Sequence, residues 1–397
     1  MSTTAADKYP GRAWRAYGFY FKVLFIFLGS RAVILLATYF AAYFVPQAGH
    51  EVWNVSPHWY HYLLRWDSGW YFYIARDGYF YSGQELVQSP VVFFPLHPLL
   101  ARFTASVLGV TAPLGVLIVS NVASLIAIPL TAKLIKAVYG AETSLVALAL
   151  LSFFPASLFF STGFSESLAL LFTISFFLFL ERRKFLLAAL CSGLAMGTRP
   201  TSIILLLPLW WELWREQGMN WKRLVLSAPT LTALATSGLW LYMLYLWRTF
   251  GHPLAFVTGQ SAWTGGSRGA GEVLLKALTL RPFGHLADFR DEGLSPATLD
   301  PWFFVLFVFV AIKWGKRLPA AWRLFLLAML LFLYLTKAGD TVGFMSFSRY
   351  LMLAFPAFAL AANSLKERAW LCLSIIGLSA AMLFMYMALY AQWYWVE

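Results

Sequence analysis

The sequence has little charge and almost no cysteine. Of its 397 residues, 12% are Asp, Glu, Lys or Arg, about half the share that is usual in soluble domains. The two cysteines, Cys191 and Cys372, lie far apart in apolar runs, which excludes a scaffold held together by disulfides. Scarce charge combined with 60% hydrophobic residues also excludes an intrinsically disordered chain.

Hydrophobic residues are abundant instead, and the mean hydropathy is +0.67. A helix needs about 20 mostly apolar residues to cross a bilayer. Apolar windows of this kind or somewhat shorter fall near residues 18–44, 91–109, 112–132, 142–161, 163–180, 185–211, 224–249, 302–314, 320–336, 349–365 and 370–392. We therefore expect one integral membrane domain over 1–397, an all-α polytopic protein with about 9–11 transmembrane helices in contact with membrane lipids.

The chain carries 30 basic and 18 acidic residues. The basic residues occur as short clusters between apolar runs, which favours the cytoplasmic loops of a membrane protein over a nucleic-acid-binding surface. Lys8, Arg12 and Arg15 precede the first window, so the positive-inside rule puts the N-terminus in the cytoplasm. We expect a multi-pass protein of the inner (plasma) membrane, with long extracytoplasmic loops at 46–90 and 251–300.

Two basic clusters disagree with this count. When every window is a span, Lys133 with Lys136, and Arg182 to Lys184, fall on the outer side. The disagreement indicates that one or two windows between residues 112 and 211 are re-entrant or broken helices.

The predicted outer segments hold most of the groups that could carry chemistry, because every Asp except Asp7 and all six His fall in or beside one of these segments. The first loop contains HWYHYLLRWDSGWYFYIARDGYFYSGQ. A helix from His61 to Asp77 would place Asp67 and Tyr71 on one stripe. Asp67 would be partly desolvated beside Trp66 and Trp70, which suits a general base. The alternatives are a solvated loop acid or an ion-pair partner of Arg65.

Ionisable residues inside apolar windows are candidates for function because burying them is costly. Glu166 either forms a structural ion pair with an arginine or contacts substrate, and Arg199 is one possible partner. Arg349, in FSRYLM at the outer edge of a window, either holds a lipid-linked phosphate or anchors the helix at the interface. His97, in FFPLHPLL, either donates to a phosphate or satisfies a local carbonyl.

Motifs for metals and nucleotides are missing. His58, His61, Asp67 and His97 have no accompanying HExxH or paired CxxC pattern, so a metal site is not indicated. The glycines of TGGSRGAG fit neither GxGxxG nor GxxxxGK[ST]. We expect a chain that needs neither metal nor cofactor.

Several segments together resemble the PIG-V family, which comprises the second mannosyltransferase of glycosylphosphatidylinositol anchor synthesis and its prokaryotic relatives, within the GT-C glycosyltransferases. The motifs are RWDSGWYFYIARDGY, VVFFPLHP, PASLFFSTGFSES, GTRPTS, GHPLAFVTGQSAW and SRYLMLAFPAF, which occur in the family's order. The chain looks like a prokaryotic member. The resemblance implies a GT-C fold whose first extracytoplasmic loop is helical and bears the active site.

The resemblance also implies the reaction, an inverting transfer of a sugar, expected to be mannose, from a polyprenyl-phosphate donor to a hydroxyl of a lipid or glycan acceptor. Asp67 would be the general base and Trp66 its partner in the family's Trp-Asp pair. Gln260 and Trp263 would shape the donor or acceptor pocket. The remaining candidates for binding substrate are Arg65, Trp70, His97, Glu166, Arg199 and Arg349.

Two other functions stay open. Many spans and intramembrane charges also suit a transporter or a flippase of a lipid-linked saccharide, although we find no convincing internal repeat. A non-catalytic assembly subunit is a further alternative, for which substitution of Asp67 would leave activity untouched.

Overall fold

The computed structural model describes residues 10–48, 58–84, 86–264, 275, 278–279, 296–337 and 346–396. Most of the expected outer loop 251–300 and part of 46–90 lie outside these ranges. The chain is 81% helical, and no strand occurs in the ranges described. The expected all-α, polytopic class is therefore confirmed.

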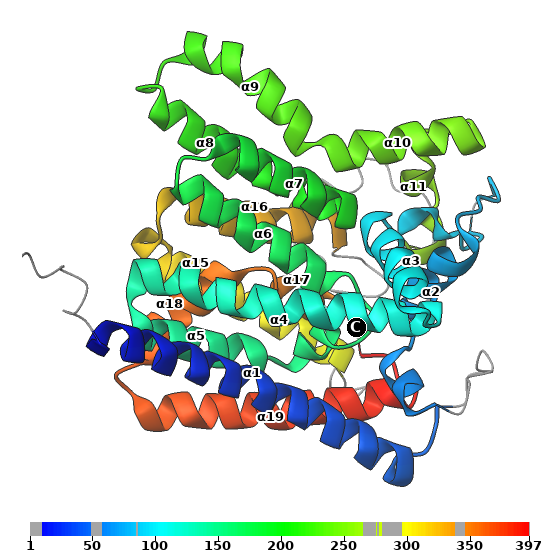
Figure 1. Cartoon of the computed structure of the whole chain (residues 1–397), viewed down its shortest axis with the longest axis horizontal. Helices are drawn as coiled ribbons and strands as arrows, with labels where there is room; N and C mark the ends of the chain where they lie inside the picture. The colour runs from blue at the N-terminus through cyan, green and yellow to red at the C-terminus, as the bar shows by residue number, and fades with distance from the viewer. Residues whose placement is uncertain are drawn as a thin grey trace, which may run out of the picture.

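Most of the longer helices run side by side, whereas α2 and α3 pack across one end (Figure 1). The first half of the chain contains α1 (Pro10–Phe44), α2 (Ser68–Asp77), α3 (Leu96–Leu108), α4 (Ala112–Tyr139), α5 (Ala141–Ser152), α6 (Glu166–Glu181), α7 (Phe185–Thr198) and α8 (Leu206–Glu216). The second half contains α9 (Trp221–Ala235), α10 (Ser237–Phe250), α11 (Ala255–Thr258), α12 (Ser261–Thr264), α15 (Pro296–Trp314), α16 (Ala320–Lys337), α17 (Phe347–Leu351), α18 (Phe355–Leu365) and α19 (Ala369–Ala391). Short 3₁₀ turns are η1 (Trp59–Leu63), η2 (Pro90–Val92), η3 (Pro155–Phe160), η4 (Pro200–Leu205) and η6 (Gly315–Arg317).

Each apolar window contains helix, but several windows are interrupted. Four segments of the described chain are long and apolar enough to cross a membrane alone: 17–44 in α1, 112–139 in α4, 298–317 in α15 and 369–391 in α19. The pair α9 and α10 makes a fifth if its 57° bend lies within one span. Prolines open η3 and η4 and divide other windows into shorter pieces, because proline cannot donate the hydrogen bond that a continuous helix needs. The number of crossings stays a prediction.

Two windows, which bear on the two disputed basic clusters, are not built as single long helices. The window at 185–211 is broken into α7 and α8, which have 14 and 11 residues, as we expected for one window between 112 and 211. The other lies earlier, at 91–109, where η2 is followed by the 13-residue helix α3. With 13 residues, α3 is shorter than a helix that crosses a bilayer alone, and it packs across one end of the bundle (Figure 1).

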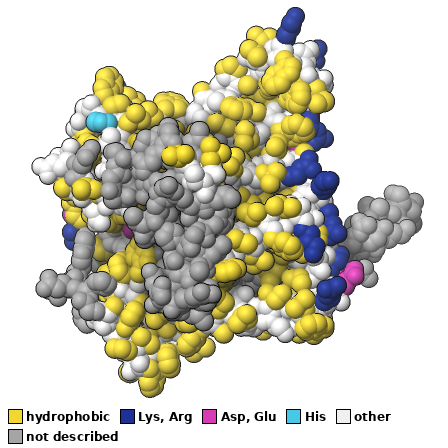
Figure 2. Space-filling view, turned by 180° about the vertical axis from the view of Figure 1, so that it is seen from behind, with side chains coloured by type: hydrophobic (Ala, Val, Ile, Leu, Met, Phe, Trp, Pro, Cys, Tyr) yellow, Lys and Arg dark blue, Asp and Glu magenta, His cyan; other side chains and the backbone are white. Residues whose placement is uncertain are grey.

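The exposed basic clusters follow one another at the same end of the bundle. Figure 2 shows Lys and Arg side chains along one edge of the molecule, which corresponds to the left end in Figure 1. Exposed basic residues at helix junctions on this end, hereafter the basic end, are Lys133, Arg182, Arg183, Lys184, Arg215, Lys222, Arg223, Lys313, Lys316, Arg317 and Arg368. The charge sorting seen in the sequence is thus a property of the folded bundle.

Candidate active site

The backbone reverses its course immediately before Asp67. The expected continuous helix from His61 to Asp77 is wrong, because η1 ends at Leu63 and α2 begins at Ser68. Between them, Trp66 has φ of +54°, a left-handed conformation that costs a bulky residue about 1–3 kcal/mol. The break puts Asp67 at the N-cap position of α2.

Trp66 and Arg65 are held by the C-terminal segment of the chain. The indole Nε1 of Trp66 donates to the carbonyl oxygen of Tyr394 at 3.2 Å, and its ring packs edge-on against Trp395. Arg65 Nε donates to the carbonyl oxygen of Ala391 at 2.9 Å. Burial lowers the pKa of Arg65 to about 10. These hydrogen bonds therefore make Arg65 an anchor of the loop, and within the described residues it forms no salt bridge with Asp67.

Asp67 instead joins three buried charged residues that come from distant parts of the chain. Arg349 Nη1 lies 3.3 Å from Asp67 Oδ2, and Arg349 Nε lies 3.3 Å from Glu166 Oε1. Arg199 Nη1 donates to the same Glu166 oxygen. We call Asp67, Glu166, Arg199 and Arg349 the charge cluster. The structure brings all four sequence candidates into one chain of ion pairs.

Burial differs along the charge cluster. The side chain of Glu166 is 0% exposed and those of both arginines are 9% exposed, whereas that of Asp67 is 19% exposed. Glu166 Oε2 is buried and accepts no hydrogen bond within the described part of the chain. Asp67 is thus the most accessible carboxylate of the cluster.

Glu166 is positioned by the start of α6. It lies in the first turn of that helix, where the helix dipole favours a carboxylate. The other end of α6, 16 residues long, leads directly to Arg182 and the basic end. At about 1.5 Å per residue this separates Glu166 from the basic end by about 24 Å. The charge cluster and the basic end therefore lie at opposite ends of α6.

Aromatic rings surround the guanidinium groups. The ring of Tyr350 lies 4.5 Å from Arg199 Cζ and 5.4 Å from Arg349 Cζ. The ring of Phe164 lies 5.4 Å from Arg349 Cζ. Such cation–π contacts stabilise a guanidinium that has left water, so both arginines are held in fixed places.

Two tryptophans from different outer segments meet beside the start of α2. Trp263 in α12 contacts Trp70 in α2, with ring centroids 6.2 Å apart, and also Phe93 at 5.9 Å. Gln260 lies in the turn between α11 and α12, where the backbone N–H of Trp263 donates to its carbonyl oxygen. The structure therefore brings Trp263 next to the Asp67 motif, and Gln260 lies in the turn that leads to it.

His97 is buried away from the charge cluster's arginines. Its Nε2 lies 3.0 Å from Ser120 Oγ, and that hydroxyl donates to the carbonyl oxygen of Phe164 at 2.8 Å. Ser120 thus accepts from Nε2–H. Burial lowers the pKa of His97 to about 3, so the imidazole is neutral at pH 7. Of the two roles expected for His97, support of a carbonyl through Ser120 matches these contacts.

Sequence reasoning missed residues that shape the site without being ionised. A Cβ on Gly163 would lie 2.5 Å from Leu64 Cδ2, so only glycine lets this loop pack against the segment that leads to Asp67. Tyr71, which we placed only on a stripe, shares a hydrogen bond of 2.9 Å with Ser165. The signal for Gly163 was its place in STGFSES, one residue before Phe164 and three before Glu166.

Asp300 was also missed as a site residue. It is 1% exposed, and its Oδ1 accepts a hydrogen bond from the backbone N–H of Ser348 at 3.2 Å. Because Arg349 is the next residue, this bond fixes the short helix α17 from which Arg349 reaches Asp67 and Glu166. The sequence shows Asp300 only as an acid in a predicted outer segment, and nothing in it indicates that Ser348, 48 residues later, is its hydrogen-bond partner.

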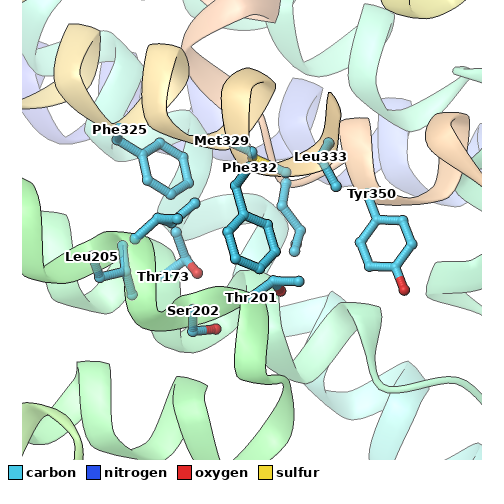
Figure 3. A pocket seen from close by; sticks show the side chains of 11 residues that line it. Thr173, Thr201, Ser202, Leu205, Phe325, Met329, Phe332, Leu333 and Tyr350 are labelled. Atoms are coloured by element: carbon cyan, nitrogen blue, oxygen red, sulfur yellow. The ribbon is translucent and has the colours of Figure 1, made fainter. Parts of the chain in front are cut away.

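A small cavity lies behind Tyr350, lined by α16 on one side and Thr201 and Ser202 on another (Figure 3). Its volume of about 10 Å³ is room for one water molecule at most. Within the described residues no group of three or more His, Cys, Asp or Glu side chains is arranged to hold a metal ion.

Fold and site together define a polytopic, all-α membrane protein with a cluster of buried ion pairs at one end of its bundle. Residues 17–211 match the family model of the mannosyltransferases named PIG-V. This segment contains Asp67, Glu166 and Arg199, and the resemblance to the PIG-V family is confirmed. Among curated protein sequences, none matches this chain.

Solved structures with detectable similarity include the oligosaccharyltransferase of Archaeoglobus fulgidus. Its apo form shares 13% identity at a TM-score of 0.45, over 92% of this chain and 56% of that one. The same archaeal enzyme, AglB, in complex with an inhibitory peptide and a dolichol-phosphate shares 14% identity at a TM-score of 0.43, over 91% and 55%. These are GT-C enzymes, but a similarity this low carries no argument. The chain spans about half their length.

Proposed function

We propose that the protein is an inverting glycosyltransferase that moves a sugar, expected to be mannose, from a polyprenyl-phosphate carrier to a hydroxyl of a lipid or glycan acceptor. The charge cluster is the observation that carries the proposal. It joins one accessible carboxylate to two guanidinium groups, and three of its four members lie in the segment that matches the mannosyltransferase family.

In this proposal Asp67 is the general base. It accepts the proton of the acceptor hydroxyl while that oxygen attacks the anomeric carbon of the sugar. The bond from that carbon to the phosphate oxygen breaks, and polyprenyl phosphate leaves with the electron pair. General-base catalysis of this kind contributes about 10²–10⁴-fold to the rate.

Arg349 would change partners during the reaction. In the structure it balances Asp67 and Glu166. A phosphate bound beside it competes for the same guanidinium, and withdrawing Arg349 from Asp67 leaves that carboxylate more basic. Arg199, held by Glu166, supplies a second positive charge. Charge that develops on the leaving phosphate is then stabilised by groups already in place.

The pair Trp70 and Trp263 provides a surface for the sugar, since aromatic rings present flat apolar faces with polar edges. This pair lies at the start of α2, the helix that Asp67 precedes. Both motifs come from the expected outer loops. The positive-inside rule assigns the basic end to the cytoplasm, so the charge cluster would face the extracytoplasmic side.

Transfer from a purified polyprenyl-phosphate mannose, measured with the full chain in lipid nanodiscs, tests the proposal. Asp67→Asn should lower kcat about 100-fold or more. Asp77→Asn is the matched control, because Asp77 follows ten residues later and forms its ion pair with the exposed Arg76, away from the charge cluster. A folded Asp67→Asn variant with near-full turnover would remove the base assignment. Flux of an intact lipid-linked saccharide without any glycosidic product would favour a flippase.

A further inference from the structure

A groove separate from the charge cluster lies between α2, α3, α7 and α10. Its volume is about 440 Å³, within the range of about 300–1,000 Å³ found for ligand sites. Ile74 from α2, Leu99 from α3, Leu194 from α7 and Leu241 from α10 each contribute to its wall. In Figure 1 α10 lies above α2 and α3, and the right-hand end of α7 lies beside them.

The lining suits a hydrocarbon rather than a polar ligand. The hydroxyl groups of two tyrosines in the lining are hydrogen-bonded to backbone carbonyl oxygens. Tyr79 donates to the carbonyl oxygen of Phe93 and Tyr242 to that of Val91, each at 2.8 Å. These tyrosines therefore offer their rings to the groove. Burial also raises the pKa of Tyr79 well above its ordinary value, which keeps that phenol uncharged.

The groove opens onto an apolar surface. Leu99, Leu241 and Tyr245 line it and are 54%, 52% and 41% exposed. Phe103 and Trp240 nearby in sequence are also exposed, at 65% and 46%. Large apolar side chains exposed in this way on a polytopic protein face lipid. An occupant can therefore enter sideways from the bilayer.

Three glycines form the floor where α7 crosses α10. A Cβ on Gly238 would lie 2.2 Å from both the carbonyl oxygen of Gly193 and the nitrogen of Gly197, so the two backbones touch. Small residues spaced four apart allow such close crossing in membranes. The 57° bend between α9 and α10 comes at the same place, so α10 departs from the line of α9 beside the groove.

Two walls of the groove lead to the charge cluster. Asp67 directly precedes α2, and Ile74, seven residues later, lines the groove about 10 Å further along that helix. On α7, Gly197 lines the groove and lies two residues before Arg199. At the rim, the exposed guanidinium of Arg102 donates to the carbonyl oxygens of Ile74, Ala75 and Arg76 at the end of α2, which holds its positive charge beside the groove. A long chain in the groove would therefore have its anionic head next to cations.

We propose that this groove holds the hydrocarbon chain of the polyprenyl-phosphate carrier. The proposal rests on the proposed function for the identity of the lipid. It adds a place for the chain, distinct from the residues that handle the phosphate and the sugar. A single groove of about 440 Å³ suits one isoprenoid chain, whereas a diacyl lipid must place two chains together.

Photolabelling tests this assignment without relying on turnover. The probe is polyprenyl phosphate with a diazirine in its chain, irradiated with the full-length protein in detergent micelles, and labelled peptides are mapped by mass spectrometry. We expect label in 193–197 and 238–245. Unlabelled polyprenyl phosphate should compete at least about tenfold better than geranyl phosphate, because each buried methylene adds about 0.8 kcal/mol. Phosphatidylglycerol should compete no better than geranyl phosphate.

Variants that fill the groove give the matched comparison. Leu194→Trp and Leu241→Trp, one on each wall, should each reduce this labelling about tenfold. Leu186→Trp is the control, because Leu186 lies on the same helix α7, is 62% exposed and does not line the groove. Each variant is first checked for wild-type unfolding temperature. The competition with geranyl phosphate needs only the wild-type chain, so it decides the question even if both groove variants unfold.

The outcomes separate the two proposals. Label in other segments, equal competition by phosphatidylglycerol, or labelling that is unchanged in the groove variants overturns the groove assignment. Label in the groove without any sugar transfer by the same preparation overturns the proposed function and leaves the groove as a polyprenyl-phosphate site. Sugar transfer with label in other segments supports the proposed function and overturns the groove assignment.

Discussion

Replacing Glu166 by glutamine should destabilise the protein strongly, although the side-chain volume hardly changes. Glu166 is 0% exposed and balances both Arg199 and Arg349, whose side chains are 9% exposed. Breaking a buried ion pair costs about 3–5 kcal/mol, because it leaves a buried charge without compensation. Here the carboxylate serves two arginines, and its place in the first turn of α6 adds about 0.3–1 kcal/mol from the helix dipole. We expect a loss of at least about 3 kcal/mol.

The assay is equilibrium unfolding in mixed micelles of mild detergent and dodecyl sulfate, followed by the fluorescence of the 18 tryptophans. Arg183→Gln is the matched control at the basic end. Arg183 pairs with Glu212 at 2.7 Å but is 41% exposed, and Glu212 keeps Arg215 at 2.9 Å. The control should lose less than about 1 kcal/mol.

A double variant sharpens this test. Glu166→Gln combined with Arg199→Gln removes a negative and a positive charge together, so its loss should be smaller than the sum of the two single losses. Strict additivity, or a Glu166→Gln variant no less stable than Arg183→Gln, would refute the view that Glu166 neutralises the two arginines.

Two further predictions concern residues that position the charge cluster. Gly163→Ala should lower the unfolding free energy by about 1–3 kcal/mol through overpacking. Gly18→Ala is the control, because nothing lies within 4 Å of the added Cβ, and it should not lower the unfolding free energy in the same assay. Equal effects of the two substitutions would contradict the close approach of Gly163 to Leu64. Asp300→Ala should raise the donor KM about tenfold or more by displacing Arg349. Asp300→Asn keeps the acceptor for the Ser348 N–H and should restore the donor KM. A loss in kcat alone, or no rescue by Asn, would show that Asp300 does not act through Arg349.

The helical content of the chain was predictable, as was a break in one window between 112 and 211, but the other interruptions were not. Hydropathy identifies α1, α4 and α19 because an apolar run long enough to cross a membrane has few other uses. Hydropathy also predicts a span at 91–109, because the mean over this window does not show that α3 is short. It also hides the break at Trp66, where contacts with the C-terminal segment hold a backbone conformation that local sequence disfavours.

Glu166, Arg199 and Arg349 were predictable one by one, because ionisable residues in apolar windows are costly and therefore stand out. Asp67 was predictable from the aromatic motif of the first loop. The pairing of these residues was not. Asp67 and Arg349 are separated by 282 residues, and the sequence equally allowed Arg65 as the partner of Asp67. Gly163 and Asp300 act through backbone packing and a single backbone hydrogen bond, and neither leaves a periodic pattern.

A structure of the protein with polyprenyl phosphate bound tests the central claim most directly. The account predicts a phosphate oxygen within about 3 Å of a guanidinium nitrogen of Arg349 or Arg199, with the ion pair between Arg349 and Asp67 opened. A phosphate bound at any other place, with the charge cluster unchanged from its present contacts, would contradict it.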